Sequence, residues 1–347
     1  GKHPEVPLFT TSEVRKTVSL FEAAPYGEPV HVNDRVRAFF HDAGHILGSS
    51  ILDLEVRENG ATRRVVFSGD LGQWDKPILR DPTLIHTADY VVMESTYGDR
   101  DHERRDDIQT QLAEVISQTV AAGGNVVVPT FAVERAQELM FYISRLADSG
   151  RIPRVPVFLD SPMAADATEV FEAHRECYDE EMWHRINSGR QPLRFPGLTM
   201  TRSVEESKTI NDLDEPAIIM APSGMCTNGR IKHHLVRNIT RPESTILFAG
   251  FQVHGTLGRQ ILDGNREVRI HGRSWPVRAR IAELQGISGH ADRSALLRWL
   301  GAFNAPPKRL FLTHGEEHVS VAFAEHLSAT MDWQVSVPKY QDAVELS

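Results

Sequence analysis

The middle of the chain alternates continuously apolar strand patterns with amphipathic helix patterns. Short apolar runs at 125–128, 155–159, 217–220 and 245–248 predict strands. Apolar residues at helical spacing, as over 108–116 and 136–146, predict helices between them. Strands that are apolar throughout and alternate with helices are typical of a parallel sheet buried on both faces. The polar stretch 187–215, which contains proline and glycine, predicts an irregular connection.

The segments on either side of this region are strand-rich. Apolar runs at 35–40, 50–56, 63–67 and 90–93 predict strands, and so does the run at 308–313. We therefore predict one domain made of residues 1–98 and 287–347, divided by an inserted α/β domain at 99–286.

Composition excludes several classes of protein. No run approaches the roughly 18 apolar residues that a membrane helix needs, and residues 1–5 show no signal pattern. Cys177 and Cys226 are the two cysteines. Two are too few for a disulfide framework or a cysteine-only zinc site, and they fit a reducing compartment. We expect a cytoplasmic protein with no membrane partner.

Charge is unevenly distributed along the 347 residues. The net charge of −9 argues against a protein that coats nucleic acid nonspecifically. Residues 225–280, however, hold ten basic and three acidic residues, a local charge of +7. This segment forms either a solvated basic face or a groove for a polyanion.

Five polar residues stand at strand ends or beside glycine-flanked turns: His45, Asp70, Glu94, His290 and His314. Imidazole and carboxylate groups are good ligands for zinc and related metals. Any one of these residues alone would more often have a structural role. Five in similar settings indicate a metal-dependent catalytic site.

Two glycine-bearing turns are weaker candidates for phosphate binding. The turn with Ser223 and Gly224 follows a strand and precedes a helix, where backbone N–H groups can face an anion. Gly255, Thr256 and Arg259 form a second such turn, and Arg135 lies near a helix start. Salt bridges explain the two arginines equally well. Asp160-Ser161-Pro162 predicts a strand-to-helix turn with Ser161 as N-cap.

The ordered set of five residues resembles the metallo-β-lactamase fold of the β-CASP nucleases, which include RNase J-like enzymes and the eukaryotic pre-mRNA 3′-end-processing endonuclease. The resemblance covers essentially the whole chain. It implies an α/β fold in which an αββα sandwich, incomplete at its N-terminal side here, carries an inserted β-CASP domain on a mainly parallel sheet.

The resemblance also implies roles for single residues. His45, Asp70 and His314 resemble zinc ligands, with Asp70 as the bridge between two ions. Glu94 and His290 resemble the next acidic and histidine motifs, and His290 is suited to protonate the departing 3′-oxygen. Contacts to the RNA backbone are expected from Ser223, Gly224, Arg135, Gly255, Thr256, Arg259 and Ser288.

One family motif is absent from the sequence. His-x-His-x-Asp-His, which supplies three ligands to the two metals, occurs nowhere in it. Three ligands cannot close a two-zinc site, so we expect this chain to be inactive alone. We expect a truncated form rather than a natural loss of the motif, because the later motifs survive.

The resulting functional hypothesis is a two-zinc ribonuclease that hydrolyses single-stranded RNA with an activated water. A DNA-directed nuclease of the same superfamily is an alternative, although His314 resembles the RNA-acting branch. A noncatalytic RNA-binding scaffold with a decayed metal site is a further alternative. Exonuclease or endonuclease mode and a homodimer stay open.

Overall fold

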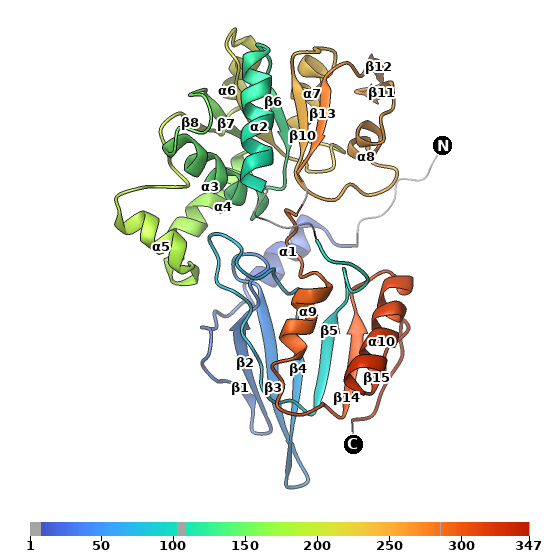
Figure 1. Cartoon of the computed structure of the whole chain (residues 1–347). Helices are drawn as coiled ribbons and strands as arrows, with labels where there is room; N and C mark the ends of the chain where they lie inside the picture. The colour runs from blue at the N-terminus through green and yellow to red at the C-terminus, as the bar shows by residue number, and fades with distance from the viewer. Residues whose placement is uncertain (1–7, 103–107, 285, 347) are drawn as a thin grey trace.

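Two β-sheets with their own helices form the two parts of the molecule (Figure 1). The computed structural model describes residues 8–102, 108–284 and 286–346, so residues 1–5, which lack a signal pattern, lie outside the described residues. The first sheet takes strands from both ends of the chain, and the second takes its strands from the middle. The predicted α/β fold is confirmed, whereas the domain boundaries after residues 98 and 286 stay a prediction.

The first sheet has seven strands in the order β1-β2-β3-β4-β5-β14-β15. Strands β1 to β4 are antiparallel neighbours, and β4, β5, β14 and β15 run parallel. The carboxyl ends of β4, β5 and β14 therefore lie at one edge of the sheet. The strands are β1 (Val30–Asn33), β2 (Val36–Asp42), β3 (Ser50–Glu58), β4 (Ala61–Phe67), β5 (Tyr90–Glu94), β14 (Arg309–Thr313) and β15 (Val335–Ser336).

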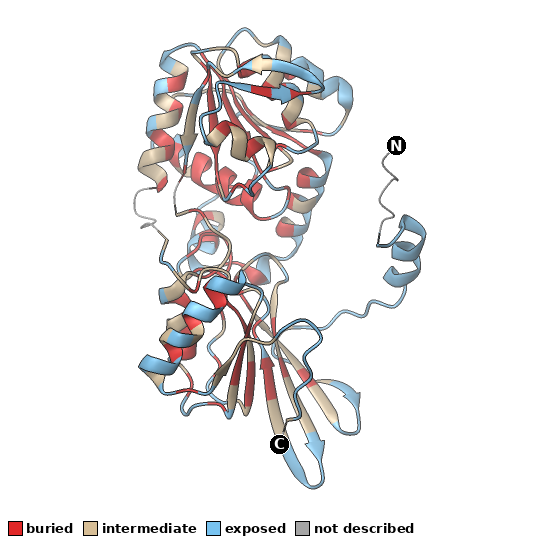
Figure 2. Ribbon diagram, turned by 90° about the vertical axis from the view of Figure 1, so that its right-hand side faces the viewer, coloured by how far each residue is buried: buried red, intermediate tan, exposed pale blue. Residues whose placement is uncertain are grey.

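Helices α9 (Arg293–Leu300) and α10 (Glu317–Met331) cover one face of this sheet. Their side chains, among them Trp299 and Phe323, share a buried core with the sheet strands. Helix α9 begins at Asp292, whose carboxylate accepts a hydrogen bond of 2.9 Å from the Ala295 N–H, as an N-cap residue does. By contrast, α1 (Thr11–Val18) has no buried residue and stands apart from both sheets (Figure 2).

The second sheet is parallel throughout, with six strands in the order β13-β10-β6-β9-β7-β8. Every residue of β6, β9 and β10 is buried, which confirms the prediction from their continuous apolar runs. The strands are β6 (Val126–Pro129), β7 (Val157–Asp160), β8 (Leu198–Thr201), β9 (Ile218–Ala221), β10 (Thr245–Phe248) and β13 (Arg280–Glu283); β11 (Glu267–Ile270) and β12 (Arg273–Pro276) form a separate antiparallel pair.

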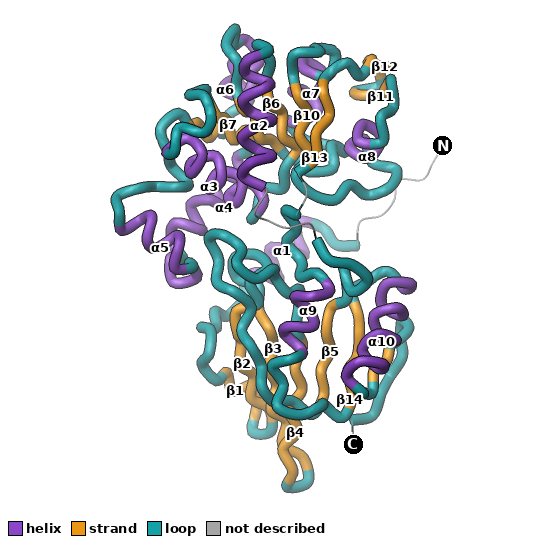
Figure 3. The backbone as a smooth tube through the Cα atoms, viewed as in Figure 1, coloured by secondary structure: helices purple, strands orange, loops and turns teal. Residues whose placement is uncertain are grey.

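Helices follow the strands of the second sheet (Figure 3). They are α2 (Ile108–Ala121), α3 (Arg135–Asp148), α4 (Pro162–Ala173), α5 (Glu180–Asn187), α6 (Val204–Thr209), α7 (Ile231–Asn238) and α8 (Leu257–Leu262), with 3₁₀ turns at Arg175–Cys177 and Ile210–Asp212. Ser161 caps α4 by accepting a hydrogen bond from the Ala164 N–H, which confirms its predicted role. No helix in the described ranges is long and apolar enough to cross a bilayer.

The expectation of an irregular connection over 187–215 is wrong. The edge strand β8 and helix α6 lie within this stretch. Ser203 and Glu206 form a capping box at the start of α6, in which each side chain accepts a hydrogen bond from the other residue's backbone N–H. The serine and the glutamate three residues later were the sequence signal for a helix start here. The flanking proline and glycine obscured it.

The segment 76–80 fixes the first part of the molecule to the second. Ile78 and Leu79 are buried in the core that surrounds the second sheet. The Asp179 N–H donates a hydrogen bond of 2.9 Å to the Ile78 carbonyl, and the Arg80 N–H donates one of 3.3 Å to the Cys177 carbonyl. The two parts therefore share apolar core as well as backbone hydrogen bonds.

A buried ion pair lies at the same junction. Lys76 Nζ is 2.9 Å from Glu134 Oε1, and the two side chains are only 1% and 5% exposed. The lysine also donates a hydrogen bond of 3.0 Å to the His45 carbonyl. Burial raises the pKa of the Glu134 carboxyl, and the nearby Lys76 charge opposes this rise. Glu134 has φ +67°, a backbone conformation that favours glycine.

Removal of one partner from this buried pair should lower the free energy of unfolding much more than removal of one partner from a surface pair. We expect Lys76→Met to lower the free energy of unfolding by about 3–5 kcal/mol, because it leaves a buried carboxylate without its cation. Lys308→Met is the matched control, since Lys308 and Asp89 lie 4.0 Å apart at the surface and exposed pairs contribute about 0–1 kcal/mol. Urea unfolding measures both values. Equal effects of the two substitutions would contradict the buried pair.

Candidate metal centre

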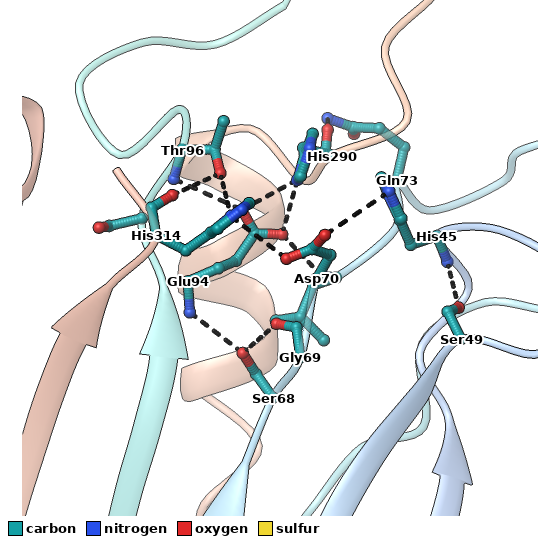
Figure 4. Close-up of polar contacts among 12 residues, drawn as sticks. His45, Ser49, Ser68, Gly69, Asp70, Gln73, Glu94, Thr96, His290 and His314 are labelled. Carbon is teal, nitrogen blue, oxygen red and sulfur yellow. Dashed lines mark hydrogen bonds and ion pairs between the residues drawn. The ribbon is translucent and has the colours of Figure 1, made fainter. Parts of the chain in front are cut away.

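The strand order of the first sheet explains why three of the five predicted site residues lie close together. Asp70 lies three residues beyond β4, Glu94 ends β5, and His314 follows β14. Glu94 and Thr313 are direct partners in the register of β5 and β14. Because these neighbouring strands are parallel, their carboxyl ends bring the three side chains to one edge (Figure 4).

Glycines bring the His45 loop against the Asp70 loop. The Gly72 N–H donates a hydrogen bond of 2.8 Å to the Ala43 carbonyl. A Cβ atom on Gly72 would lie 1.8 Å from the Gly44 carbonyl oxygen, so no side chain fits there. Gly44 itself has φ +65°. This contact between two backbones places His45 beside Asp70.

Asp70 lies between two histidines. Its Oδ1 is 3.2 Å from His314 Nδ1, and its Oδ2 is 3.9 Å from His45 Nε2. The Thr96 hydroxyl donates a hydrogen bond of 2.9 Å to the His314 carbonyl and so fixes the backbone of that loop. His314 is the most exposed of the three, with 58% of its side chain accessible. The Asp70 carboxylate therefore has one oxygen directed to each ring, as a carboxylate that bridges two metal ions would have.

Glu94 and His290 form a second, more buried pair. Both carboxylate oxygens of Glu94 lie 3.2 Å from His290 Nδ1, and Glu94 Oε1 also accepts a hydrogen bond of 2.6 Å from the Leu71 N–H. Burial lowers the pKa of His290, but the hydrogen bond and charge of Glu94, with Asp70, outweigh it and raise the pKa above its usual value. Glu94 thus favours a protonated imidazole whose Nδ1 is already occupied.

The donor atoms suit zinc. His45, Asp70 and His290 form one group, and Glu94, His290 and His314 form another, in each of which the ligand atoms lie within 4.8 Å of one another. His45 Nδ1 is buried and has no hydrogen-bond partner among the described residues. Burial, and then the positive charge of His290, lower the pKa of His45. A low pKa favours the neutral ring that binds metal.

The two predicted phosphate turns lie side by side. Buried Gln252 donates a hydrogen bond of 3.0 Å to the Gly224 carbonyl, and the Gly258 N–H donates one of 3.1 Å to the Met225 carbonyl. These bonds join the turn of Ser223 and Gly224 to the turn that precedes α8. The sequence did not predict that the two turns are joined, because nothing in the pattern of neighbouring residues marks Gln252 as buried.

Most polar groups of these turns have local partners. Ser223 Oγ accepts a hydrogen bond of 3.1 Å from the Thr227 N–H, and Thr256 Oγ1 accepts one of 3.2 Å from the Arg259 N–H. Gly255 is exposed and has φ +85°. The turns hold their own amide groups in place, and their predicted contacts to RNA stay a prediction.

The remaining predicted RNA contacts are placed differently. Arg135 is nearly buried, and its guanidinium lies 2.5 Å from Glu138, so its position does not support a surface phosphate contact. Arg259 is paired with Asp263 on α8. Ser288 is half-buried, two residues before His290. Ser288 therefore lies near His290 in the chain, and its contact to RNA stays a prediction, whereas Arg135 is buried and lies away from any open surface.

Comparison with known proteins agrees with this geometry. A Beta-Casp domain model matches residues 136–261, and a model described as a Zn-dependent metallo-hydrolase RNA specificity domain matches residues 274–338. "Ribonuclease TTHA0252" of Thermus thermophilus is 36% identical over 338 residues, which cover 97% of this chain and 76% of that protein. "Transcription termination factor FttA" of Methanocaldococcus jannaschii is 31% identical over 352 residues, 99% of this chain and 55% of that protein.

The fold and the site define an α/β protein of the metallo-hydrolase class. The chain belongs to the β-CASP family of the metallo-β-lactamase fold. The resemblance inferred from the sequence is thereby confirmed. The chain spans about three quarters of the Thermus relative and about half of the FttA relative.

The close approach at Gly72 can be tested directly. Gly72→Ala should lower the free energy of unfolding by about 1–3 kcal/mol, because the added methyl group overlaps the Gly44 carbonyl and must displace the His45 loop. Gly301→Ala is the control, since its Cβ would lie 3.2 Å from the nearest atom and should change stability by less than about 0.5 kcal/mol. Urea unfolding reports both. A Gly72→Ala protein as stable as the control would mean that the backbones do not meet as described.

Proposed function

We propose that the protein is a zinc-dependent ribonuclease that hydrolyses phosphodiester bonds of single-stranded RNA. The observation that carries this proposal is the convergence of five side chains at one sheet edge, with the Glu94–His290 pair beside Asp70. Support also comes from the RNA specificity model over 274–338 and from the relative named a ribonuclease.

His45, Asp70 and His314 are the residues that would hold zinc, with Asp70 reaching toward both rings. Bound zinc supplies a Lewis acid for the phosphate and makes water a stronger nucleophile near neutral pH. Because a closed zinc site takes about four ligands per ion, three donors leave two ions incompletely held. The His-x-His-x-Asp-His motif supplies further ligands in this family.

The zinc content of two forms of the protein tests this ligand count. We expect the 347-residue chain to hold little zinc, and a form that also carries the His-x-His-x-Asp-His motif to hold about two ions. Elemental analysis after exhaustive dialysis measures the content. Tight, stoichiometric zinc in the shorter chain would show that other residues complete the site.

His290 is the proposed general acid. Its Nδ1 faces Glu94, so its Nε2 is the nitrogen left to give a proton to the departing 3′-oxygen. Glu94 orients the ring and favours its protonated form. However, His290 belongs to both groups of side chains that could hold a metal ion. The experiment must therefore distinguish a general acid from a zinc ligand at this position.

Substitutions at His290 and His314 make this separation in the form that carries the complete motif. His290→Ala should keep its zinc and lose about 10²–10⁴-fold in kcat, the usual contribution of a general acid. His314→Ala should lose zinc and rate together. An RNA with a 3′-bridging phosphorothiolate has a leaving group that needs no proton, so it should restore the rate of His290→Ala and leave His314→Ala slow.

Two controls complete this experiment. His31→Ala removes an exposed histidine on β1 and should change neither zinc nor rate. A single-stranded DNA of the same sequence should be cleaved much more slowly than the RNA; equal rates would favour the DNA-directed alternative. Loss of zinc from His290→Ala would make this residue a ligand, and zinc-loaded protein without any nuclease activity would favour the scaffold alternative.

A further inference from the structure

Two exposed phenylalanines stand where the second sheet meets the metal centre. Phe131 and Phe251 are 46% and 55% exposed. Phe131 lies two residues beyond β6, and Phe251 lies three residues beyond β10. Strands β6 and β10 are parallel neighbours, and so are β10 and β13. Because β13 runs on to His290 within seven residues, the carboxyl ends of all three strands face the first sheet.

Phe251 shares a hollow with the metal centre. A cavity of about 620 Å³ is lined by Phe251 from the second part, and by His314, Thr96, Tyr97 and Arg100 from the first. The Arg100 guanidinium lies 4.9 Å from the centre of the Tyr97 ring and is half exposed. Glu316 also lines this hollow, and Arg100 lies 3.6 Å from Asp99, so acidic groups partly balance the arginine charge. What the hollow offers to RNA is an exposed aromatic ring next to a proposed zinc ligand.

The backbone holds both phenylalanines in place. Gln252, the residue after Phe251, is buried and hydrogen-bonded to the Gly224 carbonyl. A Cβ atom on Gly224 would lie 2.8 Å from the Phe131 ring, so this ring packs closely against a glycine. Single exposed phenylalanines are common and need no explanation. Two exposed phenylalanines at the ends of neighbouring strands, one of which shares a hollow with the candidate metal centre, do call for an explanation.

We propose that Phe251 stacks on the base next to the phosphate held at the metal centre, and that Phe131 stacks on a base further along the same strand. This inference rests on the proposed function and adds how the RNA is held. Aromatic side chains bind single-stranded nucleic acid in this way because every base presents a π-face. Stacking tolerates any base, so it predicts little sequence preference at these two positions.

The test measures binding and needs no cleavage. The probe is a short single-stranded RNA with hydrolysis-resistant phosphorothioate linkages and one 2-aminopurine, whose fluorescence falls when it stacks. All measurements use the zinc-loaded form that carries the His-x-His-x-Asp-His motif, and wild type here means that form without a substitution. For this wild-type protein we expect quenching when the 2-aminopurine is next to the bound phosphate. Phe251→Leu should abolish this quenching and raise the Kd roughly tenfold, and Phe251→Trp should restore both. Phe131→Leu should do the same for a label further along the strand.

An abasic RNA distinguishes stacking from a structural role. Removal of the base next to the bound phosphate should weaken wild-type binding by the same factor as Phe251→Leu, and the two changes together should add nothing further. Phe21→Leu is the control, because Phe21 is 74% exposed in the segment that follows α1, and it should bind RNA as the wild type does.

The outcomes separate this inference from the proposed function. If the wild type binds and cleaves RNA, but Phe251→Leu weakens binding equally with and without the base, stacking is wrong and the ribonuclease proposal stands. Unchanged binding by Phe251→Leu overturns stacking in the same way. If the zinc-loaded wild type with the complete motif binds no RNA at all, both proposals fall.

Discussion

The contact between the backbones of Gly44 and Gly72 is the constraint on which the site depends. Parallel pairing alone brings Asp70, Glu94 and His314 to one edge, since β4, β5 and β14 are neighbours. His45 comes from a loop between two antiparallel strands and has no such guide. It lies near the carboxylate because Gly72, which has no side chain, lets the two loops touch, while a side chain on Gly44 would overlap Arg80 and Pro82. The placement of His45 thus requires glycine at positions 44 and 72.

The segment that follows this contact packs the first part of the molecule against the second. Within a few residues of Gly72, Lys76 pairs with Glu134, and Ile78 and Leu79 enter the neighbouring core. The same lysine donates a hydrogen bond to the His45 carbonyl. One side chain, Lys76, therefore joins the loop of the proposed zinc ligand His45 to the start of helix α3. The candidate metal centre therefore lies at the junction through which the two parts of the molecule pack together.

Periodicity and residue type predicted much of this architecture. The buried strands β6, β9 and β10 were predicted from their apolar runs. Glu94 and His290 were both singled out as site candidates, and the structure adds that they pair. The Lys76–Glu134 pair could not be predicted, because two isolated charged residues 58 positions apart resemble ordinary surface residues.

Arg135 shows the converse limit of sequence analysis. Its position near a helix start suggested an anion site, but a neighbouring carboxylate on the same helix occupies the guanidinium. Patterns along the chain identify elements and strand ends. They do not show whether a basic side chain is buried or which nearby carboxylate it pairs with.

The unusual backbone of Glu134 links two positions that are far apart in the sequence. A glycine would adopt φ +67° without steric cost, yet it would leave the Lys76 ammonium buried without a counter-charge. A neutral residue at 76 would in turn make a buried carboxylate at 134 unfavourable. Relatives should therefore fall into two groups, one with a cation at 76 and an acid at 134, the other with a neutral residue at 76 and glycine at 134. Sequences that mix the two states should be rare, and the covariation of these positions would record the junction between the sheets.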